Sequence, residues 1–390
     1  MRKVYIVGVG STIFGKHSGE AIESLAVTAA VDALLESTVN REQVGALYLG
    51  NFISGPLNGK EILAGIVADR MGLQNIPCTK VEGACASGGI AFRHACMTVA
   101  SGEAEAALAI GVETMTHATT KQTTAALNCA LDNESDGPSG LTFPGLYGLA
   151  WRLHAEQFGT ARQHVSAVIK KNKGNGVRNP LAQMGATLSD DTIANSAPIC
   201  DPIQLYDCCP TSDGAAAVVV VSEALAQQIS QTLKHRTIEV LASVQTRGSP
   251  SIAGHQNLLS FDATVRAAKR AYEMAKVKPA EVDVVELHDC FSIAEIIDSE
   301  DLGLVPPGQG GYWAYEGRTA IDGDIAINAS GGLLAKGHPV GATGVGQIYE
   351  VVQQLRHAHA NQVPNANIGM THNLGGAGVA CTVSILRGVA

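Results

Sequence analysis

One cysteine lies where a short predicted strand turns into a helix. The segment Val81-Glu-Gly-Ala-Cys85-Ala-Ser-Gly88-Gly89 surrounds Cys85 with small residues, which let the backbone bend sharply and present the thiol at the carboxyl end of the strand. The free N–H groups and positive dipole end of the following helix favour a thiolate and predict a lowered pKa for Cys85. A thiolate attacks carbonyl carbon, so the pattern indicates a nucleophile. The alternative is a buried cysteine in a packing turn.

A second candidate is a histidine in a glycine-rich segment near the C-terminus. His338 lies in Gly337-His338-Pro339, which Gly341-Ala342-Thr343-Gly344 follows, between a predicted strand and a predicted helix. Glycines let another element or a ligand approach the backbone closely, and Pro339 fixes the chain direction after the histidine. An imidazole aimed into a pocket in this way suits a base that serves a nucleophile. A surface histidine in a loop is the alternative, and the spacing of a nucleotide-binding P-loop is absent.

Two further segments carry polar groups at predicted strand ends. Val285-Glu-Leu-His288-Asp289-Cys290-Phe291 ends a strand, which is where open α/β sheets carry their active groups. His288 and Cys290 are two residues apart, so in an extended chain they point the same way. The alternative makes His288 a capping residue and Cys290 part of the core. The glycine-rich run 371–378 is predicted to be a turn between two strands, and its backbone N–H groups are suited to an oxyanion hole.

These segments need a scaffold, and short apolar runs alternate with alanine-rich helical stretches along most of the chain. Fully apolar strands between helices predict a mostly parallel sheet that is covered on both faces. A polar stretch at about residues 119–206 interrupts the alternation and is expected to form an inserted cap. The same order of elements before and after it indicates two similar halves. The predicted boundaries are an N-terminal half at 1–118 plus 209–235, a cap at 119–208 and a C-terminal half at 236–390.

The composition limits the class of protein. The chain of 390 residues has 46% hydrophobic and 16% charged residues, which indicates a large buried core in two or three domains. A net charge of -9 without a basic run argues against nucleic acid as a partner, and no apolar run suits a membrane span. Nine irregularly spaced cysteines fit reduced thiols in a cytoplasm, and without paired Cys-x-x-Cys motifs we expect no metal. The apolar run Val4–Gly8 is interpreted as a first strand rather than a secretory signal.

Taken together, the four segments resemble the thiolase superfamily over nearly the whole chain, and the Gly337-His338-Pro339 segment is the most specific of them. The resemblance implies an α/β fold with five layers (α/β/α/β/α), two similar halves and an inserted loop domain. His288-Asp289-Cys290-Phe291 is similar to the branch of sterol-carrier-protein-type thiolases and archaeal acetoacetyl-CoA thiolases. Other thiolases carry an Asn-Glu-Ala-Phe-like motif there. They also have a Cys-x-Gly motif near the C-terminus, whose cysteine position holds Asn373 here.

The resemblance also implies roles for these residues. Cys85 would be the nucleophile that takes an acyl group from a coenzyme A thioester, and His338 would accept its proton and later polarise a thioester carbonyl. Cys290 would be the acid/base that removes the α-proton of the second acyl-CoA. His288 and His338 would form one oxyanion hole. The backbone N–H groups of Cys85 and Gly375 would form the other.

The contacts to coenzyme A stay unassigned at this point. A chain with net charge -9 must bind this polyanion with local positive charge, and four cations of the cap are candidates, although the charged face of a helix is usually solvated. These candidates are Lys170, Lys171, Lys173 and Arg178. Four other histidines are expected to have structural roles, namely His94, His117, His154 and His164.

The leading function that the resemblance implies is an acyl-CoA C-acyltransferase without a tightly bound cofactor, which condenses two acetyl-CoA to acetoacetyl-CoA, as in the mevalonate pathway. One alternative is a 3-ketoacyl-CoA thiolase of fatty-acid or sterol side-chain degradation, and another is a decarboxylating enzyme similar to β-ketoacyl synthases. A third is a subunit that passes acetoacetyl-CoA to 3-hydroxy-3-methylglutaryl-CoA synthase in a complex with a zinc-ribbon/OB-fold protein. The resemblance also implies a homodimer or homotetramer.

Overall fold

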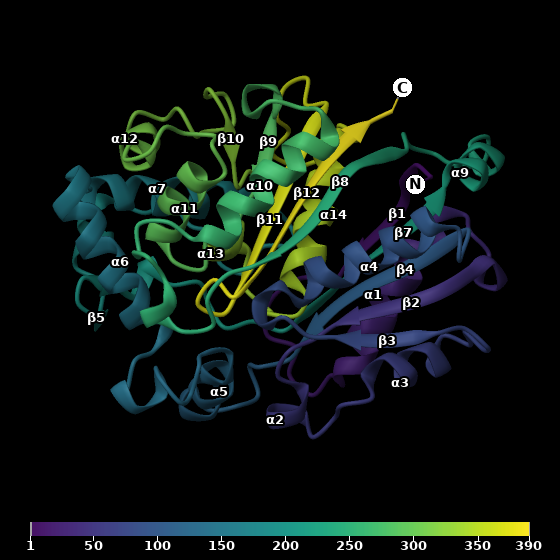
Figure 1. Cartoon of the computed structure of the whole chain (residues 1–390), viewed down its shortest axis with the longest axis horizontal. Coiled ribbons are helices and arrows are strands. Elements are labelled where there is room, and N and C mark those ends of the chain that lie inside the picture. Colours follow the sequence, from purple (N-terminus) through teal and green to yellow (C-terminus); the bar gives the residue numbers. More distant parts are fainter. Residues whose placement is uncertain (1, 390) are drawn as a thin grey trace.

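The computed structural model describes residues 2–389 (Figure 1). The first part of the chain alternates strands and helices, as its apolar pattern predicts. Its elements are β1 (Val4–Ser11), α1 (Ile22–Ser37), β2 (Val44–Gly50), α2 (Ser54–Asn58), α3 (Leu63–Arg70), β3 (Cys78–Val81), α4 (Ser87–Ser101) and β4 (Ala106–Glu113). The cap stretch follows with α5 (Thr120–Leu127), α6 (Phe143–Phe158), α7 (Arg162–Arg178), α8 (Asp190–Ala194), β5 (Pro198–Cys200) and β6 (Ile203–Gln204).

The chain then returns to the main body. Strand β7 (Gly214–Ser222) and helix α9 (Glu223–Ile229) complete the first half. The second half contains β8 (Ile238–Arg247), α10 (Asp262–Ala275), β9 (Val284–Glu286), α11 (Ser292–Asp301), α12 (Gly310–Tyr315), β10 (Ala326–Ile327), α13 (Gly332–Lys336), α14 (Thr343–Leu355), β11 (Ile368–Gly375) and β12 (Ala380–Gly388). The predicted boundaries of the cap, 119–208, stay a prediction.

Ten strands form one sheet in the order β10-β9-β11-β12-β8-β1-β7-β4-β2-β3. In the first half, β7 is antiparallel to both β1 and β4, and β2 is parallel to β4 and β3. The second half repeats this arrangement, because β12 is antiparallel to β8 and β11, and β9 is parallel to β11 and β10. The two halves are therefore similar in topology, as the repeated order of elements indicates. They meet where β1 and β8 pair over two residues.

The sheet is mixed, which corrects the expectation of a mostly parallel one. The chain leaves the sheet at Glu113, the last residue of β4, and returns at Gly214, which pairs with Glu113 in the antiparallel direction. The cap thus lies inside a connection between two neighbouring antiparallel strands. Both strands are buried on both faces, so their continuous apolar sequences look like those of parallel strands.

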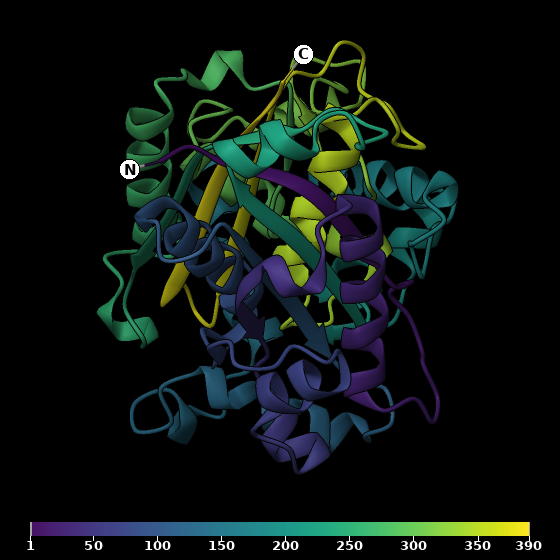
Figure 2. The same ribbon diagram turned by 90° about the vertical axis from the view of Figure 1, so that its right-hand side faces the viewer.

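Three hydrophobic clusters separate the layers. Val219 and Val221 of β7 pack with α1 and α3 on one face, whereas Val218 and Val220 pack with α4 and α14 on the other. The cluster around α4 and α14 also contains residues of β9, β10 and β12, so these two helices lie between the halves of the sheet (Figure 2). Helices α10 and α11 cover the outer face of the second half. The fold therefore has the five layers that the sequence implies.

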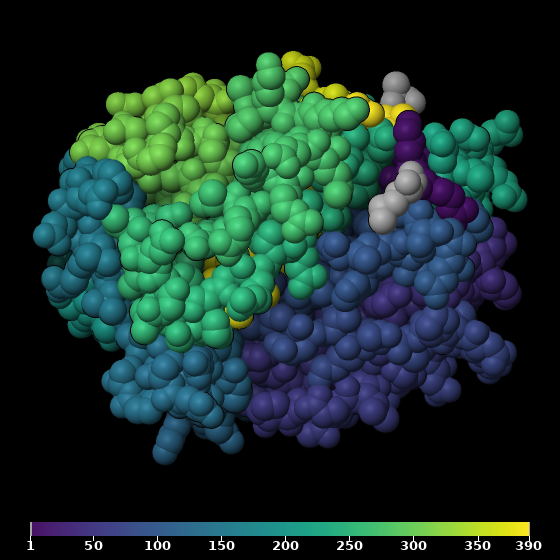
Figure 3. All heavy atoms as spheres, in the orientation of Figure 1, coloured from purple at the N-terminus to yellow at the C-terminus, as the bar shows by residue number. Residues whose placement is uncertain are grey.

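The space-filling view shows how the chain segments share the surface. The first half (purple to blue) and the second half (green) form adjacent blocks, and cap residues (blue-green) flank them on one side (Figure 3). Within residues 2–389, none of the helices combines the length and the apolar character that crossing a membrane requires.

Candidate active site

A strained turn presents Cys85 between β3 and α4. Ala84 has φ of 51°, a left-handed conformation that is unusual for a residue with a side chain. Ser87 braces the turn, because its hydroxyl donates to the carbonyl of Ala84 (2.7 Å) and accepts from the N–H of Gly83 (3.0 Å). Helix α4 begins at Ser87, two residues after the cysteine. The sharp bend that the small residues suggest is therefore present directly before the cysteine.

The glycine-rich segment around His338 packs tightly against this turn. It leads from a strand into a helix, as predicted, since α14 starts at Thr343, and it also contains the short helix α13. A Cβ atom added to Gly88 would lie 2.8 Å from the carbonyl oxygen of Gly341. Only glycine allows the N-terminal ends of α4 and α14 to approach this closely. The ring of His338 is held by Thr343, whose Oγ1 lies 2.7 Å from Nδ1.

His288 and Cys290 lie in a tight loop between β9 and α11. The N–H of Cys290 donates to the carbonyl of His288 (2.9 Å), so the segment is curled rather than extended as predicted. Asp289 between them accepts hydrogen bonds from the N–H groups of Leu333 (2.7 Å) and Leu334 (3.2 Å) of α13. The middle residue of the motif thus ties this loop to the segment that carries His338.

These three segments converge on one cavity of about 210 Å³. Cys85, His288, Cys290 and His338 all line it, and one sulfur or nitrogen atom from each of Cys85, His288 and His338 lies within 4.8 Å of the others. The same spacing would accept a soft metal ion, so the expectation of no metal stays a prediction. The remaining wall is mostly apolar and includes Met115, Leu127, Phe143, Tyr147, Phe291 and Val340.

Burial dominates the electrostatics of the nucleophile. It raises the pKa of Cys85 to about 12, although the backbone N–H groups of Gly376 and of Cys85 itself act in the opposite direction. The expectation that the helix end lowers this pKa is therefore wrong. Desolvation in the apolar cavity outweighs the dipole, and Cys85 carries its proton at rest.

The same apolar environment acts on the other members of the site. Burial lowers the pKa of His338 to about 3 and that of His288 well below its ordinary value, so both imidazoles are neutral. Burial, followed by the proximity of Cys209, raises the pKa of Cys290 well above its ordinary value, and a hydrogen bond with Tyr147 opposes this rise. Tyr147 comes from α6 of the cap and stacks on Phe291 with ring centroids 4.7 Å apart.

Strand β11 supplies two further groups. Asn373, 2% exposed, donates from Nδ2 to the carbonyl of Cys85 (2.9 Å). The run 371–378 is not wholly a turn as predicted, because β11 extends to Gly375. The glycine that lines the cavity and directs its N–H toward the Cys85 sulfur is Gly376, one residue beyond the Gly375 that the resemblance implies.

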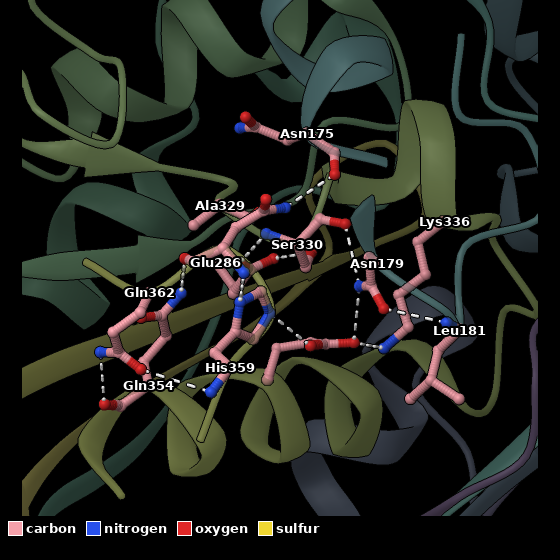
Figure 4. Close-up of polar contacts among 12 residues, drawn as sticks. Asn175, Asn179, Leu181, Glu286, Ala329, Ser330, Lys336, Gln354, His359 and Gln362 are labelled. Atoms are coloured by element: carbon pink, nitrogen blue, oxygen red, sulfur yellow. Dashed lines mark hydrogen bonds and ion pairs between the residues drawn. The ribbon is translucent and has the colours of Figure 1, made fainter. Parts of the chain in front are cut away.

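A buried polar network supports the segment from Ser330 to Lys336 from behind (Figure 4). Glu286 of β9 accepts from the N–H (3.0 Å) and the hydroxyl (2.5 Å) of Ser330. Lys336 forms an ion pair with Glu350 of α14, which also contacts His359 (2.9 Å). Charged groups pair here inside the protein, and removing one partner would leave a buried charge uncompensated, which would destabilise the fold. The network fixes the chain that leads to His338.

The cap lysines proposed for coenzyme A have other partners. Lys173 is buried and donates to the carbonyl of Leu334 (2.6 Å), and Lys171 donates to the carbonyl of Ile327 (2.6 Å). Both anchor α7 to the second half, which excludes them as free phosphate ligands. Lys170 pairs with Asp190 (2.8 Å) near the surface. Arg178 is exposed, and no ion pair involves it within residues 2–389.

The four histidines expected to be structural lie outside the cavity lining. His154 contacts Thr160 (2.7 Å) in the buried interior, and His164 packs against Tyr312 with centroids 4.4 Å apart. His117 contacts the carbonyl of Leu57 (3.1 Å). His94 lies beside Tyr48, with centroids 5.6 Å apart.

Comparison with known families gives the identity of the fold. A model of the thiolase N-terminal domain matches residues 4–224, and one described as thiolase C-terminal domain-like matches residues 244–388. The chain belongs to the thiolase family. This confirms the resemblance, whereas the branch that the His-Asp-Cys-Phe motif suggests stays a prediction.

Several relatives of this thiolase cover it nearly end to end. A protein of Methanothermobacter thermautotrophicus named acetyl-CoA acetyltransferase is 42% identical over 99% of both chains. Sterol carrier protein 2 of Rattus norvegicus is 35% identical over 99% of this chain and 72% of its own length. A solved structure named Ltp2-ChsH2(DUF35) aldolase has a TM-score of 0.85 and 22% identity, covering 99% of this chain and 98% of that chain, which shows a shared fold.

Sequence reasoning missed three contributors to the site of this thiolase. Tyr147 lies in the polar cap stretch without a surrounding motif, so nothing in the sequence marks it. Thr343 is within the glycine-rich segment, where a hydroxyl five residues after a candidate base was the available signal. Glu113 ends an apolar strand and accepts from the N–H groups of Phe52 (2.9 Å) and Gly341 (3.2 Å), which links the two halves at the cavity.

Proposed function

We propose that this thiolase is an acetyl-CoA C-acetyltransferase, which joins two acetyl-CoA molecules to acetoacetyl-CoA in a reversible Claisen condensation. The observation that carries the proposal is the convergence of Cys85, His288, Cys290 and His338 on one cavity. Thiolase family membership and the relatives named acetyl-CoA acetyltransferase support an acyltransferase. The cavity of about 210 Å³ is small, which favours a short acyl group.

In the first half-reaction, Cys85 attacks the thioester carbon of acetyl-CoA. Because its pKa is raised, the thiol must lose its proton during the attack, and the neutral His338 is the base that accepts it. His338 then gives this proton to the sulfur of the departing coenzyme A. The products are acetyl-Cys85 and coenzyme A thiol, so protons balance. A sulfur nucleophile also leaves readily, as the reverse direction requires.

In the second half-reaction, burial favours the thiol of Cys290, so Cys290 first gives its proton to the neutral His338. The Cys290 thiolate then removes the α-proton of another acetyl-CoA. The resulting carbon attacks acetyl-Cys85, the Cys85 sulfur leaves and takes the proton from His338, and Cys290 keeps the α-proton, so protons balance. The thioester oxygen that carries the enolate charge lies in the hole formed by His288 and His338. The acetyl oxygen on Cys85 lies in the second hole, with the N–H of Cys85 and that of Gly376 in place of Gly375.

Two substitutions test the assignment. Cys85→Ala is expected to abolish acyl-enzyme formation from radiolabelled acetyl-CoA, whereas Cys290→Ala acylates but does not complete condensation. Cys200→Ala is the matched control, because this cysteine is exposed on β5 away from the cavity, and it should retain both steps. Condensation at the normal rate in Cys290→Ala rejects the role of that cysteine. Absence of label on Cys85 in the unmodified enzyme rejects the whole proposal.

The second candidate is a 3-ketoacyl-CoA thiolase of degradation, which the similarity to sterol carrier protein 2 supports. A longer acyl chain would need more space than the present cavity offers, unless the wall formed by residues 142–147 moves. Thiolysis rates over a series of 3-ketoacyl-CoA chain lengths separate the two candidates. A maximum at acetoacetyl-CoA supports the condensing enzyme, and a maximum at long chains supports degradation.

We also propose that the enzyme is a cytoplasmic homodimer or homotetramer of the mevalonate pathway. The open edge of the sheet at β3, where Cys78 and Thr79 are exposed, supports pairing between copies.

A complex with 3-hydroxy-3-methylglutaryl-CoA synthase and a zinc-ribbon/OB-fold protein is the wider assembly, and the solved structure named Ltp2-ChsH2(DUF35) aldolase supports such a partner. Size-exclusion chromatography of native extract tests this. Comigration with two other chains supports the complex, and a stable homo-oligomer alone opposes it.

A further inference from the structure

Asn373 uses every polar atom of its buried side chain inside the site. Its Oδ1 accepts from the N–H of Gly89 (3.3 Å), and its Nδ2 donates to the carbonyl oxygen of Cys85 (2.9 Å). These contacts fix the orientation of the amide, because a flipped amide would face a donor with a donor and an acceptor with an acceptor. The second hydrogen of Nδ2 is then available to Nδ1 of His288, which lies 3.3 Å away.

This contact determines where the proton of His288 lies. Burial, and after it the proximity of His338 and His372, lowers the pKa of His288 well below its ordinary value, so the ring carries a single proton. Nδ1 accepts the hydrogen bond from Asn373 and therefore has no proton. The proton of His288 lies on Nε2, the atom that the amide leaves free.

His338 is held in the opposite tautomer. The hydroxyl of Thr343 donates to the carbonyl of Pro339 (3.2 Å), so its oxygen is free to accept from Nδ1–H of His338 (2.7 Å). This leaves a lone pair on Nε2 of His338. Two adjacent imidazoles in one cavity thus differ in function, because one offers an N–H donor and the other a base.

We propose that Asn373 is a positioning residue that holds His288 in its Nε2–H tautomer, which makes His288 the standing donor to the thioester oxygen of the second acyl-CoA. This assignment rests on the proposed function, since condensation is the step that needs the donor. In the resting enzyme the hole contains one N–H, from His288. His338 joins it only while its Nε2 carries a proton. The two histidines are therefore not interchangeable. The amide of Asn373 donates a hydrogen bond to Nδ1 of His288, which a thiol at this position would do only weakly.

The tautomers can be read directly from resting enzyme labelled with ¹⁵N in its histidines. Signals are assigned with His288→Gln and His338→Gln variants. In the unmodified enzyme, we expect Nδ1 of His288 to lack a proton and Nδ1 of His338 to carry one. In Asn373→Asp, the carboxylate can only accept, so Nδ1 of His288 gains a proton. A protonated Nδ1 of His288 in the unmodified enzyme overturns the proposal.

Kinetics give an independent readout. Loss of the single donor in Asn373→Asp is expected to slow condensation about 100-fold, as for other oxyanion-hole donors. Acylation of Cys85 should stay within about tenfold, because it uses the other hole. The matched control is Thr343→Val, which should alter the ¹⁵N signals of His338 but not those of His288. It should slow acylation of Cys85 more than Asn373→Asp does, because His338 is the base of that step. Equal loss of both steps in Asn373→Asp overturns the proposal.

A second variant keeps the proposal testable if the first one does not fold. If Asn373→Asp does not show a cooperative thermal transition, Asn373→Ala removes the donor without adding charge. The signals of His288 should then average between the two tautomers, and an unchanged single tautomer overturns the proposal. The labelled spectra need no substrate. An enzyme that fails to acylate would therefore refute the proposed function, while the tautomer assignment is judged separately.

Discussion

The rings of His288 and His338 meet edge to face, with centroids 4.9 Å apart and planes at 81°. The carboxyl group of Glu286 ties their two segments together, because Glu286 ends the strand before His288 and accepts from both the N–H and the hydroxyl of Ser330. Asp289 adds a second tie through Leu333. The relative placement of the two imidazoles therefore depends on buried polar contacts within the second half of the chain. Glu113 of the first half and Lys173 of the cap add contacts to the segment that carries His338.

The raised pKa of Cys85 predicts a thiol that resists alkylation in the absence of substrate. Burial keeps the proton on sulfur, so iodoacetamide should modify Cys85 more slowly than the exposed Cys200 at pH 8. The rate at Cys85 should still be rising at pH 10, since its pKa is about 12. Mass spectrometry of the peptides measures both rates in one sample, with Cys200 as the internal control. A plateau of the Cys85 rate below pH 7 would show that the helix end dominates after all.

Tyr147 predicts a selective effect on the second half-reaction. Its hydrogen bond lowers the pKa of Cys290 against the effect of burial, so Tyr147→Phe should make the Cys290 thiolate rarer. The ring and its stacking on Phe291 remain, which limits the structural damage. We expect condensation to slow about tenfold, as for loss of one hydrogen bond to a charged group. The rise of the condensation rate with pH, which reports ionisation of Cys290, should move to higher pH.

Stopped-flow and steady-state rates check this prediction, with acylation of Cys85 as the reference. Acylation should change less than twofold, because Tyr147 has no contact with the proton path from Cys85 to His338. Equal slowing of both steps would mean that the hydroxyl supports the cavity as a whole. Phe143→Leu alters the same wall without touching a polar group and serves as the matched control.

The sequence predicts the architecture well because the relevant signals are local. Apolar periodicity gives the strands and helices of both halves, and the glycines around Cys85 and His338 mark the close approach of α4 and α14. The direction of β7 could not be predicted, since the cap separates it from its partner β4 and both strands are apolar on both faces. The pKa of Cys85 also could not be predicted. It depends on apolar walls from distant segments, which the helix dipole does not reveal.

Glu286 predicts a pH dependence of stability. Burial and the nearby Glu350 raise its pKa to about 7, so the folded protein prefers the protonated carboxyl. The favourable contribution is complete below the ordinary value of 4.5 and is lost as the pH rises through 7. Glu286→Gln mimics the protonated form and keeps one acceptor and one donor for Ser330. It should therefore gain about 2–3 kcal/mol relative to the unmodified protein between pH 5 and pH 8.

Unfolding midpoints of both proteins across this pH range test the prediction. The expected result is a difference in unfolding free energy between the two proteins that grows with pH. Taking this difference cancels the contributions of the other titrating groups, which both proteins share. Asp283→Asn is a suitable control, because this carboxylate accepts from the N–H groups of Asn367 and Ile368 outside the buried network. A constant difference between pH 5 and pH 8 would show that Glu286 is ionised in the folded protein throughout.

Two glycines predict opposite effects of the same substitution. At Gly344, the first turn of α14 crosses α4, and an added Cβ would overlap the N–H of Gly89 and the Oδ1 of Asn373. One of these atoms belongs to the backbone and the other to a side chain of the site, so moving either of them would distort the fold or the site. Gly344→Ala should destabilise the protein by about 1–3 kcal/mol or more and separate Cys85 from His338, with loss of acylation. Gly65 in α3 faces open space, with no atom within 4 Å of an added Cβ.

Gly65→Ala should therefore stabilise the protein by about 0.5–1 kcal/mol, because alanine loses less conformational entropy in a helix, and it should leave acylation unchanged. Thermal unfolding and the burst of acetyl-Cys85 are measured for both variants under identical conditions. Retention of acylation in Gly344→Ala would mean that the contact between α4 and α14 relaxes without moving the catalytic groups. The close crossing of these two helices would then be a feature of packing alone, and the geometry of the cavity would depend on the polar ties of Glu286 and Asp289.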